Sequence, residues 1–360
     1  MKIGLSFDLK NPSTAVTAST PDDSQEEYDS FETIQAIAAV LEKEGHEVVL
    51  LGGGEPFLHR VLSEKPDFVF NISEGVGISP SREAQVPTVL EMLRIPYSGS
   101  EPQCLGICLD KALTKRIVSL SGVRTAPFVV ISRFQEASDV ATDGLVFPLF
   151  AKPLYEGSSK GIRYQSRLQS HGELVKTVEQ LLCHYHQPVL VEPYLPGADV
   201  TVGLLGNSPT EILGVMRILP KEPRDNFFYS LEVKRDWERL VTYESPPILP
   251  RSTLEELQSF ALSAFATLGC RDVARVDFRL DAEGRPHFLE INALPGLSPV
   301  YGDLVIMARM NGISFEALIR RIFLEALKRT SSFESRAEQA LTAEVAEHGE
   351  KHTKIKFEIL

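Results

Sequence analysis

The stretch RVDFRLDAEGRPHFLEIN, residues 275–292, constrains the fold of this chain more than any other. Two runs rich in β-branched and aromatic residues flank the segment DAEGRP, whose composition is typical of a hairpin turn. On the second run Glu290 and Asn292 are two residues apart, so they project from the same face of a strand. Asp277 on the first run can lie across from them. Apolar residues alternate with these polar ones, which commits the other face to a core.

The hairpin also carries a candidate metal site. An aspartate, a glutamate and an asparagine that converge through oxygen atoms are a typical ligand set for Mg²⁺ that holds nucleotide phosphates. The alternative is an exposed hairpin face with ordinary polar residues. The alternation favours the metal site, and so does the stiff turn ALPG at 293–296, which can present backbone N–H groups beside the metal. We therefore predict that Asp277, Glu290 and Asn292 bind a metal ion.

The first third of the chain alternates between strand-like and helix-like segments. Strands that alternate with helices through short connections are typical of a parallel α/β sheet, and we predict such a domain at residues 1–105. Its predicted strands cover 2–8, 46–52 and 66–72, and its amphipathic helices lie within 24–45 and 82–95.

Two further segments are rich in predicted strands. The smaller segment covers residues 106–196, with helices at 110–122 and 171–185 and a strand at 188–195. Residues 197–330 form a larger one, with four strand-like runs and helices at 252–269 and 314–329. Residues 331–360 are charged and mixed, and we expect a partly helical appendage without a chemical role.

A loop of small residues lies within the middle segment, in KPLYEGSSKGI at 152–162. Glycines let backbone N–H groups approach an anion closely, and serine hydroxyls add further donors. Taken alone, such a loop is typical of a surface turn. Its interpretation as a phosphate-binding loop depends on the rest of the chain.

Composition excludes several classes of protein. The formal net charge of −12 argues against nucleic-acid binding, which depends on clustered Lys and Arg. No apolar run approaches the roughly 20 residues that span a bilayer, and MKIGLSFDLK has no signal-peptide core. The cysteines lack CxxC spacing, and we interpret Cys104 and Cys108 as small buried residues rather than zinc ligands. These features predict a cytoplasmic protein that binds neither nucleic acid nor membrane.

Two glycine-rich stretches do not match the known nucleotide fingerprints. GGG at 52–54 lacks the Lys-Ser/Thr of a P-loop, and GVG at 75–77 is too short for a dinucleotide-binding motif. We therefore expect neither a P-loop ATPase nor a dehydrogenase.

Several short motifs occur together in one order: DK at 110–111, EGSS at 156–159, VEPYL at 191–195, RVD at 275–277 and EINALPG at 290–296. In this order they resemble the ATP-grasp fold and, more narrowly, the D-alanine–D-alanine ligase family. The resemblance extends more loosely over the N-terminal domain and stops near residue 330.

The resemblance implies an α/β protein in which an N-terminal parallel α/β domain precedes a two-subdomain ATP-grasp fold. It implies ATP and Mg²⁺ as cofactors, with two metal ions and with Mn²⁺ as an alternative. The partners would be small amino-acid substrates. A homodimer through the N-terminal domain is common in this family, although no residue here establishes one.

The resemblance also assigns residues to the nucleotide. Lys111 and Lys152 would contact the phosphates, Glu192 and the backbone up to Leu195 would read the adenine edge, and Asp199 would hold the ribose. Phe150, Phe228 and Leu289 are candidates for the walls of the adenine slot, with plain core as the alternative for Phe150 and Leu289. The full nucleotide-binding set is Lys111, Lys152, Glu156, Gly157, Ser158, Ser159, Glu192, Leu195, Asp199, Tyr229, Lys234 and Leu289.

Four residues receive catalytic roles from the resemblance. Arg275 and the N–H of Gly296 would stabilise negative charge on the oxygens of the attacked carboxyl group. Ser158 would touch the substrate, and Lys234, in a lid that also carries Tyr229, would reach the γ-phosphate. A lid suits this chemistry, because ATP phosphorylates a carboxylate and water would hydrolyse the acyl phosphate before an amine displaces the phosphate.

Three departures from the family concern the substrates. The family's GG.S.E motif, whose glutamate holds the first amino acid's ammonium, is missing; acids such as Asp23, Glu26 and Glu27 stand in that region. Arg235 replaces a tyrosine expected after the lid lysine, and an arginine there would repel an ammonium or attract a carboxylate. Tyr301 and Gly302 replace a Ser-Leu pair.

These departures leave three hypotheses. The first is a ligase that joins two D-alanine molecules for peptidoglycan synthesis. The second is a ligase of the same fold for a different amino acid, dipeptide or hydroxy acid. The third is a nucleotide-binding protein that has lost catalysis.

Overall fold

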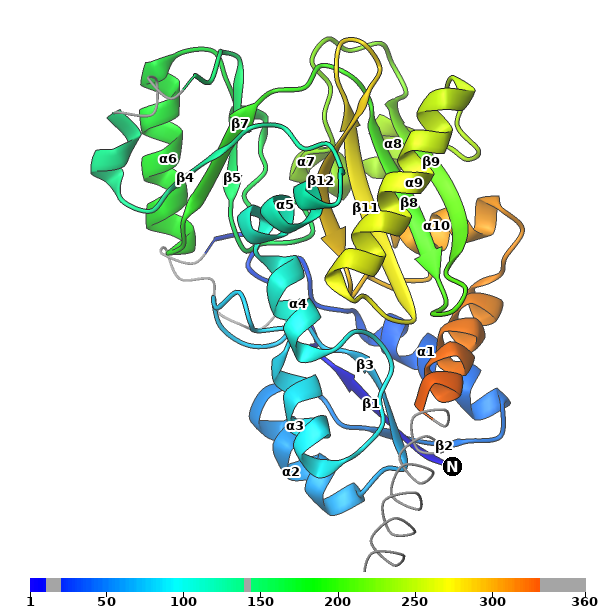
Figure 1. Cartoon of the computed structure of the whole chain (residues 1–360). Helices are drawn as coiled ribbons and strands as arrows, with labels where there is room; N and C mark the ends of the chain where they lie inside the picture. Colours follow the sequence, from blue (N-terminus) through cyan, green and yellow to red (C-terminus); the bar gives the residue numbers. More distant parts are fainter. Residues whose placement is uncertain (11–20, 139–143, 331–360) are drawn as a thin grey trace, which may run out of the picture.

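The strands that the computed structural model describes form three separate sheets (Figure 1). The structure describes residues 1–10, 21–138 and 144–330. The predicted appendage at 331–360 lies outside the described residues, and so does part of the segment in which the GG.S.E motif was expected. No described helix is long and apolar enough to cross a membrane.

The N-terminal sheet is parallel, as predicted, with the strand order β2-β1-β3. Its helix α1 begins at Phe31 rather than near Ser24, because the side chain of Ser30 accepts the N–H of Thr33 and caps the helix. Two short helices of this region, α2 and α4, were not predicted as such. The elements are β1 (Lys2–Phe7), α1 (Phe31–Lys43), β2 (Glu47–Leu50), α2 (Gly54–Glu64), β3 (Phe68–Ile72), α3 (Gln85–Leu93) and α4 (Pro102–Leu109).

The middle sheet is antiparallel, with the order β4-β7-β5-β6, and α6 packs against β5 and β7. The loop predicted to bind phosphate leaves this sheet directly after β5. The elements are α5 (Lys111–Leu120), β4 (Val129–Ile131), η1 (Phe134–Ser138), β5 (Leu149–Pro153), η3 (Tyr164–Ser166), β6 (Arg167–Leu168), α6 (His171–Tyr185) and β7 (Val189–Pro193).

The third sheet has the order β10-β9-β8-β11-β12 and contains the predicted hairpin as β11 and β12. Helices α5 and α9 pack together and against β12, while α10 packs against β9. The elements are β8 (Asp199–Leu205), β9 (Glu211–Pro220), α7 (Leu231–Arg235), α8 (Trp237–Leu240), β10 (Val241–Glu244), α9 (Arg251–Leu268), β11 (Val273–Leu280), β12 (Pro286–Asn292) and α10 (Asp303–Met310).

A helix over residues 315–330 returns the chain to the N-terminal sheet. Leu318 and Ile322 are buried in the same apolar cluster as Ile3 and Leu5 of β1. Figure 1 shows this helix, in orange, beside α1. The predicted boundary between residues 105 and 106 falls inside α4, so the first two predicted domains share a helix.

Candidate active site

A cleft between the middle and the third sheet contains most of the residues predicted to bind nucleotide. Its lining comes from β5, β7, β8, β11 and β12, from the loop after β5, and from the region of α7. The predicted residues that line it are Phe150, Lys152, Ser158, Ser159, Glu192, Leu195, Asp199, Phe228, Tyr229, Lys234, Arg275, Asp277, Leu289 and Glu290. A smaller adjoining cavity brings Lys111, Gly157, Asn292 and Gly296 to Ser158, Arg275 and Glu290.

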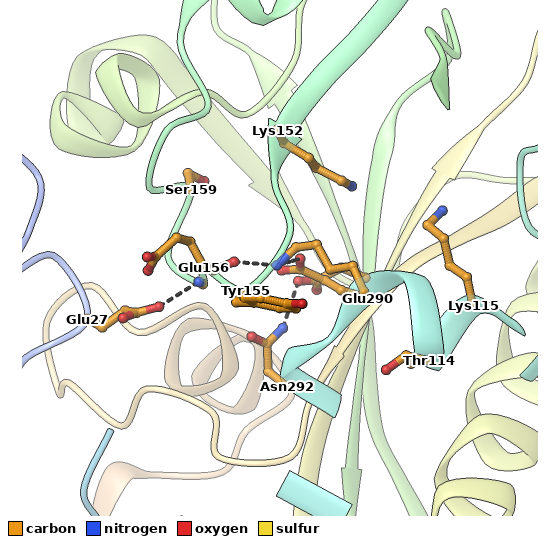
Figure 2. Close-up of polar contacts among 12 residues, drawn as sticks. Glu27, Thr114, Lys115, Lys152, Tyr155, Glu156, Ser159, Glu290 and Asn292 are labelled. Atoms are coloured by element: carbon orange, nitrogen blue, oxygen red, sulfur yellow. Dashed lines mark hydrogen bonds and ion pairs between the residues drawn. The ribbon is translucent and has the colours of Figure 1, made fainter. Parts of the chain in front are cut away.

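The three predicted metal ligands lie together on the hairpin. Asp277 pairs with Glu290 across the two strands, and the amide Nδ2 of Asn292 donates to Asp277 Oδ2 at 3.1 Å. Figure 2 shows Glu290 and Asn292 pointing toward the same space. The ammonium of Lys111 lies 3.2 Å from Glu290 Oε2. A cationic group thus already occupies the vicinity of these carboxylates.

The charge state of Glu290 suits a metal ligand. Burial by itself would raise the pKa of Glu290, but Lys111, Lys152 and Arg275 outweigh burial and hold it at about 2. Glu290 is therefore ionised at neutral pH. Two carboxylates and an amide that converge through oxygen atoms match the hard-cation preference of Mg²⁺.

Arg275 lies where the smaller cavity meets the main cleft. Its guanidinium donates to Asp277 with Nε at 3.0 Å and Nη2 at 2.8 Å, and it lies 3.8 Å from Asp303. These acids fix the orientation of the planar guanidinium. Gly296 lines the same cavity, and its N–H has no acceptor among the residues that the structure describes.

The loop after β5 has the strained geometry of an anion-binding loop. Ser158 and Ser159 are in the left-handed region at φ of 48° and 61°, which is uncommon for residues other than glycine. Their N–H groups have no acceptor within the described parts of the chain, whereas the N–H of Gly157 donates to Glu27 at 2.5 Å. The loop thus leaves the two serine amides, rather than that of Gly157, for a phosphate.

Glu156 differs from its predicted place. Its carboxylate lies away from the cleft in a buried ion cluster with Arg82 and Lys160, to which Glu27 also belongs. Only its backbone carbonyl faces the site, where it accepts from Lys111. The side chain of Glu156 therefore anchors the loop and does not reach the cleft.

Lys152 and Glu192 form a buried network with Lys115. The carboxylate of Glu192 lies 2.8 Å from Lys115 Nζ and 3.0 Å from Lys152 Nζ. Burial favours the neutral acid, yet the two lysines hold the pKa of Glu192 at about 2. The side chain of Glu192 is thus committed to lysines, and only its backbone can read a base.

Aromatic side chains form one end of the cleft. The ring of Phe150 lies 5.1 Å from that of Phe228 and 6.4 Å from that of Tyr194. Phe150 and Leu289 are half-buried and line the cleft, which favours a slot wall over plain core. The N–H of Leu195 has no acceptor among the described residues, as a donor to an adenine edge requires.

The segment around α7 covers the phosphate loop. The N–H of Leu231 donates to Ile162, and the hydroxyl of Ser159 donates to the carbonyl of Tyr229. Lys234 lines the cleft, and its ammonium has no ion-pair partner among the described residues. Burial lowers its pKa. Asp199 holds the same segment, since its Oδ2 accepts the N–H of Tyr229 at 3.1 Å.

The altered substrate pocket lies beside this segment. Arg235 donates to Glu26 at 2.7 Å and to Asp22 at 2.8 Å. Arg235 is therefore not free to attract a substrate carboxylate, which is a role that its position in the sequence suggested. Tyr301 lines the same pocket, with Lys10 over its ring at 5.8 Å.

Sequence reasoning missed several residues of the site. Lys115 follows Lys111 by four positions on the predicted helix, so helical spacing could have placed both on one face. No local sequence pattern identifies Asp303 or Arg279 as a residue of the site. Arg279 binds Asp199 and the carbonyl of Leu195, contacts that depend on how two distant strands pair.

The sequence that builds this site also matches a family model. The model described as the D-ala D-ala ligase C-terminus matches residues 117–324.

The sequences of two curated relatives align with most of this chain. The chain is 31% identical over 314 residues to a D-alanine–D-alanine ligase of Gloeobacter violaceus, with 87% of this chain and 99% of that one covered. It is 32% identical over 308 residues to an uncharacterised protein, y4sG, of Sinorhizobium fredii, with 82% and 87% covered.

Among solved structures, a D-alanine–D-alanine ligase of Bacillus anthracis has the same fold. The two chains superpose with a TM-score of 0.70 at 24% identity, over 92% of this chain and 99% of that one.

Proposed function

This chain belongs to the D-alanine–D-alanine ligase family of ATP-dependent ligases, and we propose that it joins two D-alanine molecules through an amide bond. The observation that carries the proposal is the convergence of charges in one cleft. Lys152 and Lys234 line it beside Asp277 and Glu290, and Arg275 lies where the cleft meets the smaller cavity. The cations suit a triphosphate, and the acids suit its metal.

The residues of the cleft support a division of labour. The aromatic slot and the N–H of Leu195 would hold the adenine, and the amides of Ser158 and Ser159 with Lys111 and Lys152 would hold the phosphates. Mg²⁺ bound by Asp277, Glu290 and Asn292 would neutralise phosphate charge, and we propose two such ions, with Mn²⁺ as a substitute.

The chemistry that this arrangement supports is acyl transfer in two steps. The carboxylate of one amino acid takes the γ-phosphoryl group of ATP, which leaves ADP and an acyl phosphate. The amine of the second amino acid then displaces phosphate and loses a proton. Arg275 and the N–H of Gly296 would stabilise the negative charge on the attacked carbonyl oxygen, while the segment around α7 keeps water out.

A second candidate function is a ligase of the same fold with another amino-acid pair. The observation that favours it is the engagement of Arg235 with Asp22 and Glu26, which reshapes the pocket where the family has a tyrosine. Either activity would use small molecules, and we propose a cytoplasmic location. A homodimer stays a prediction.

The test is phosphate release from ATP and Mg²⁺ with a panel of D- and L-amino acids, supplied singly and in pairs. Mass spectrometry identifies any amide that forms. We expect release with D-alanine alone and formation of its dipeptide. Release only with another pair would assign the altered pocket to that specificity, and ATP binding without any product would contradict the ligase function.

A further inference from the structure

Three carboxylates to which the mechanism assigns no role line the smaller cavity: those of Glu27, Glu74 and Glu83. Glu74 follows β3, and Glu83 lies just before α3. Both line the cavity together with Ser158, Arg275 and Gly296. Glu83 is only 8% exposed, and neither carboxylate forms a hydrogen bond or ion pair with any residue that the structure describes.

The cations near these acids are engaged elsewhere. Arg82, the neighbour of Glu83 in the chain, donates to Glu27, to Glu156 and to the carbonyl of Tyr155. The ammonium of Lys111 contacts Glu290 and the carbonyl of Glu156. Neither lies within ion-pair distance of Glu83. Buried acids without a counter-ion are costly, so they indicate a cation that arrives with a ligand.

The acids of the N-terminal segment, by contrast, have cationic partners. Glu27 binds Arg82 at 3.0 Å and Lys160 at 3.1 Å, and Glu26 binds Arg235 at 2.7 Å. Their negative charge is already neutralised. An incoming ammonium group would gain more from Glu74 and Glu83, which have no such partners.

The pKa values agree with this contrast. Burial raises the pKa of Glu83 to about 8, and burial together with Glu83 raises that of Glu74. By comparison, Arg82 and Lys160 overcome the burial of Glu27 and hold its pKa at about 2. Neighbouring acids of this kind share protons until a cation replaces them.

The lining of the cavity therefore contains both cationic or N–H donor groups and carboxylates. Arg275 and the free N–H of Gly296 suit a carboxylate, and Glu74 and Glu83 suit an ammonium. The cavity volume of about 50 Å³ is room for roughly four waters, at 10–15 Å³ each. This size fits a small zwitterion and not a long side chain.

On the basis of the proposed function, we propose that Glu74 and Glu83 bind the amino group of the amino acid whose carboxylate is phosphorylated. They would select a small α-amino acid over a 2-hydroxy acid of the same shape at this position. The hydroxy acid brings no positive charge, so it would gain no ion pair with either acid.

Hydroxylamine isolates this position, because it replaces the second amino acid as the nucleophile and converts the acyl phosphate into a hydroxamate and phosphate. We would supply ATP, Mg²⁺ and hydroxylamine with either D-alanine or D-lactate and measure the hydroxamate formed. With the wild-type chain we expect at least about 10-fold higher kcat/KM for D-alanine, from hydrogen bonds to charged groups.

The variants Glu83→Gln and Glu74→Gln keep the shape of each side chain and remove its charge. Each should raise the KM for D-alanine about 10-fold or more and leave the KM for ATP unchanged. The double variant should lose most of the preference over D-lactate. Glu55→Gln, on the exposed face of α2, is the matched control and should behave as wild type.

Thermal melting separates binding from folding. At neutral pH the raised pKa keeps Glu83 largely protonated in the free protein, and glutamine resembles the protonated acid, so the melting temperature of Glu83→Gln should stay close to that of wild type. An unchanged KM for D-alanine in both single variants, or equal use of D-lactate by wild type, would overturn the inference and leave the ligase function intact. If wild type forms no hydroxamate from any amino acid, the proposed function fails first, and the inference falls with it.

Discussion

At the residue scale, the site is built from carboxylates whose charge is maintained by buried cations. Glu290 and Glu192 each lie against lysines from other elements, and both have a pKa of about 2. These acids are ionised throughout the neutral range. Their roles differ, because Glu290 faces the smaller cavity with Asn292, whereas Glu192 is surrounded by Lys115 and Lys152.

The metal assignment predicts the effect of two substitutions. Asp277→Asn and Glu290→Gln should each lower phosphate release by more than about 100-fold, since even residues that only support a metal ligand cost 10–100-fold when changed. Folding should change little, because both side chains are partly exposed in the cleft. Steady-state turnover and thermal melting measure the two effects. Near-normal turnover in both variants would remove the metal assignment.

Lys115 is predicted to matter for stability. Lys115→Met removes one of two cations from the buried carboxylate of Glu192 and should cost about 3 kcal/mol of unfolding free energy. Chemical denaturation measures this cost. Lys176→Met, at an exposed position on α6, is the matched control.

The same ion pairs predict how stability depends on pH. The pKa of Glu192 is lowered from 4.5 to about 2 by folding, so its stabilisation is complete above about pH 4.5 and is lost as the pH falls toward 2. Acid unfolding of Lys115→Met should therefore begin at a higher pH than that of wild type. Coincident acid transitions would contradict the pairing.

At the scale of elements, α7 links three parts of the molecule. Its N–H groups and those of the preceding residues reach the phosphate loop and Asp199, and Arg235 at its end binds Asp22 and Glu26 of the N-terminal segment. The element that covers the nucleotide is thus held by the segment that borders the substrate pocket.

Arg235→Ala should loosen this cover. Exposed ion pairs contribute up to about 1 kcal/mol each, so the KM for the amino acids should rise by roughly 2- to 10-fold, with more ATP hydrolysis per dipeptide formed. Salt should raise the KM of wild type more than that of the variant, because it screens these pairs. Arg239→Ala, whose side chain is 80% exposed on α8, is the control. Identical coupling ratios in both variants would contradict a role for Arg235 in closure.

At the scale of the whole molecule, the helix over 315–330 joins the end of the described chain to its beginning. Phe323 is 1% exposed, and its ring lies 5.4 Å from that of Phe68 on β3. The ion cluster of Arg82, Glu27 and Glu156 makes a second connection, between the N-terminal domain and the phosphate loop.

Phe323→Ala should weaken the first connection. Loss of a fully buried phenylalanine costs about 3–5 kcal/mol, and we expect the N-terminal domain to unfold before the remainder. Differential scanning calorimetry would show a second, earlier transition, while nucleotide binding at low temperature is kept. Leu262→Ala, at a partly exposed position on α9, is the control. A single transition at the wild-type temperature would contradict this coupling.

Local sequence patterns predicted most of the elements and the chemistry that they carry. Periodicity of two placed Asp277, Glu290 and Asn292 on one hairpin face, and the structure confirms that register. Strand-helix alternation predicted the parallel N-terminal sheet, which is also confirmed. These features were readable because local spacing decides which side chains share a face.

Which charges neutralise one another became clear only from the packing of the folded chain. The sequence could not show that Glu156 turns away from the cleft, that Arg235 is engaged by Glu26, or that Glu83 has no partner among the residues that the structure describes. Each of these depends on contacts between segments far apart in the chain. Electrostatic energy depends on distance and burial, and neither is set until the sheets pack together.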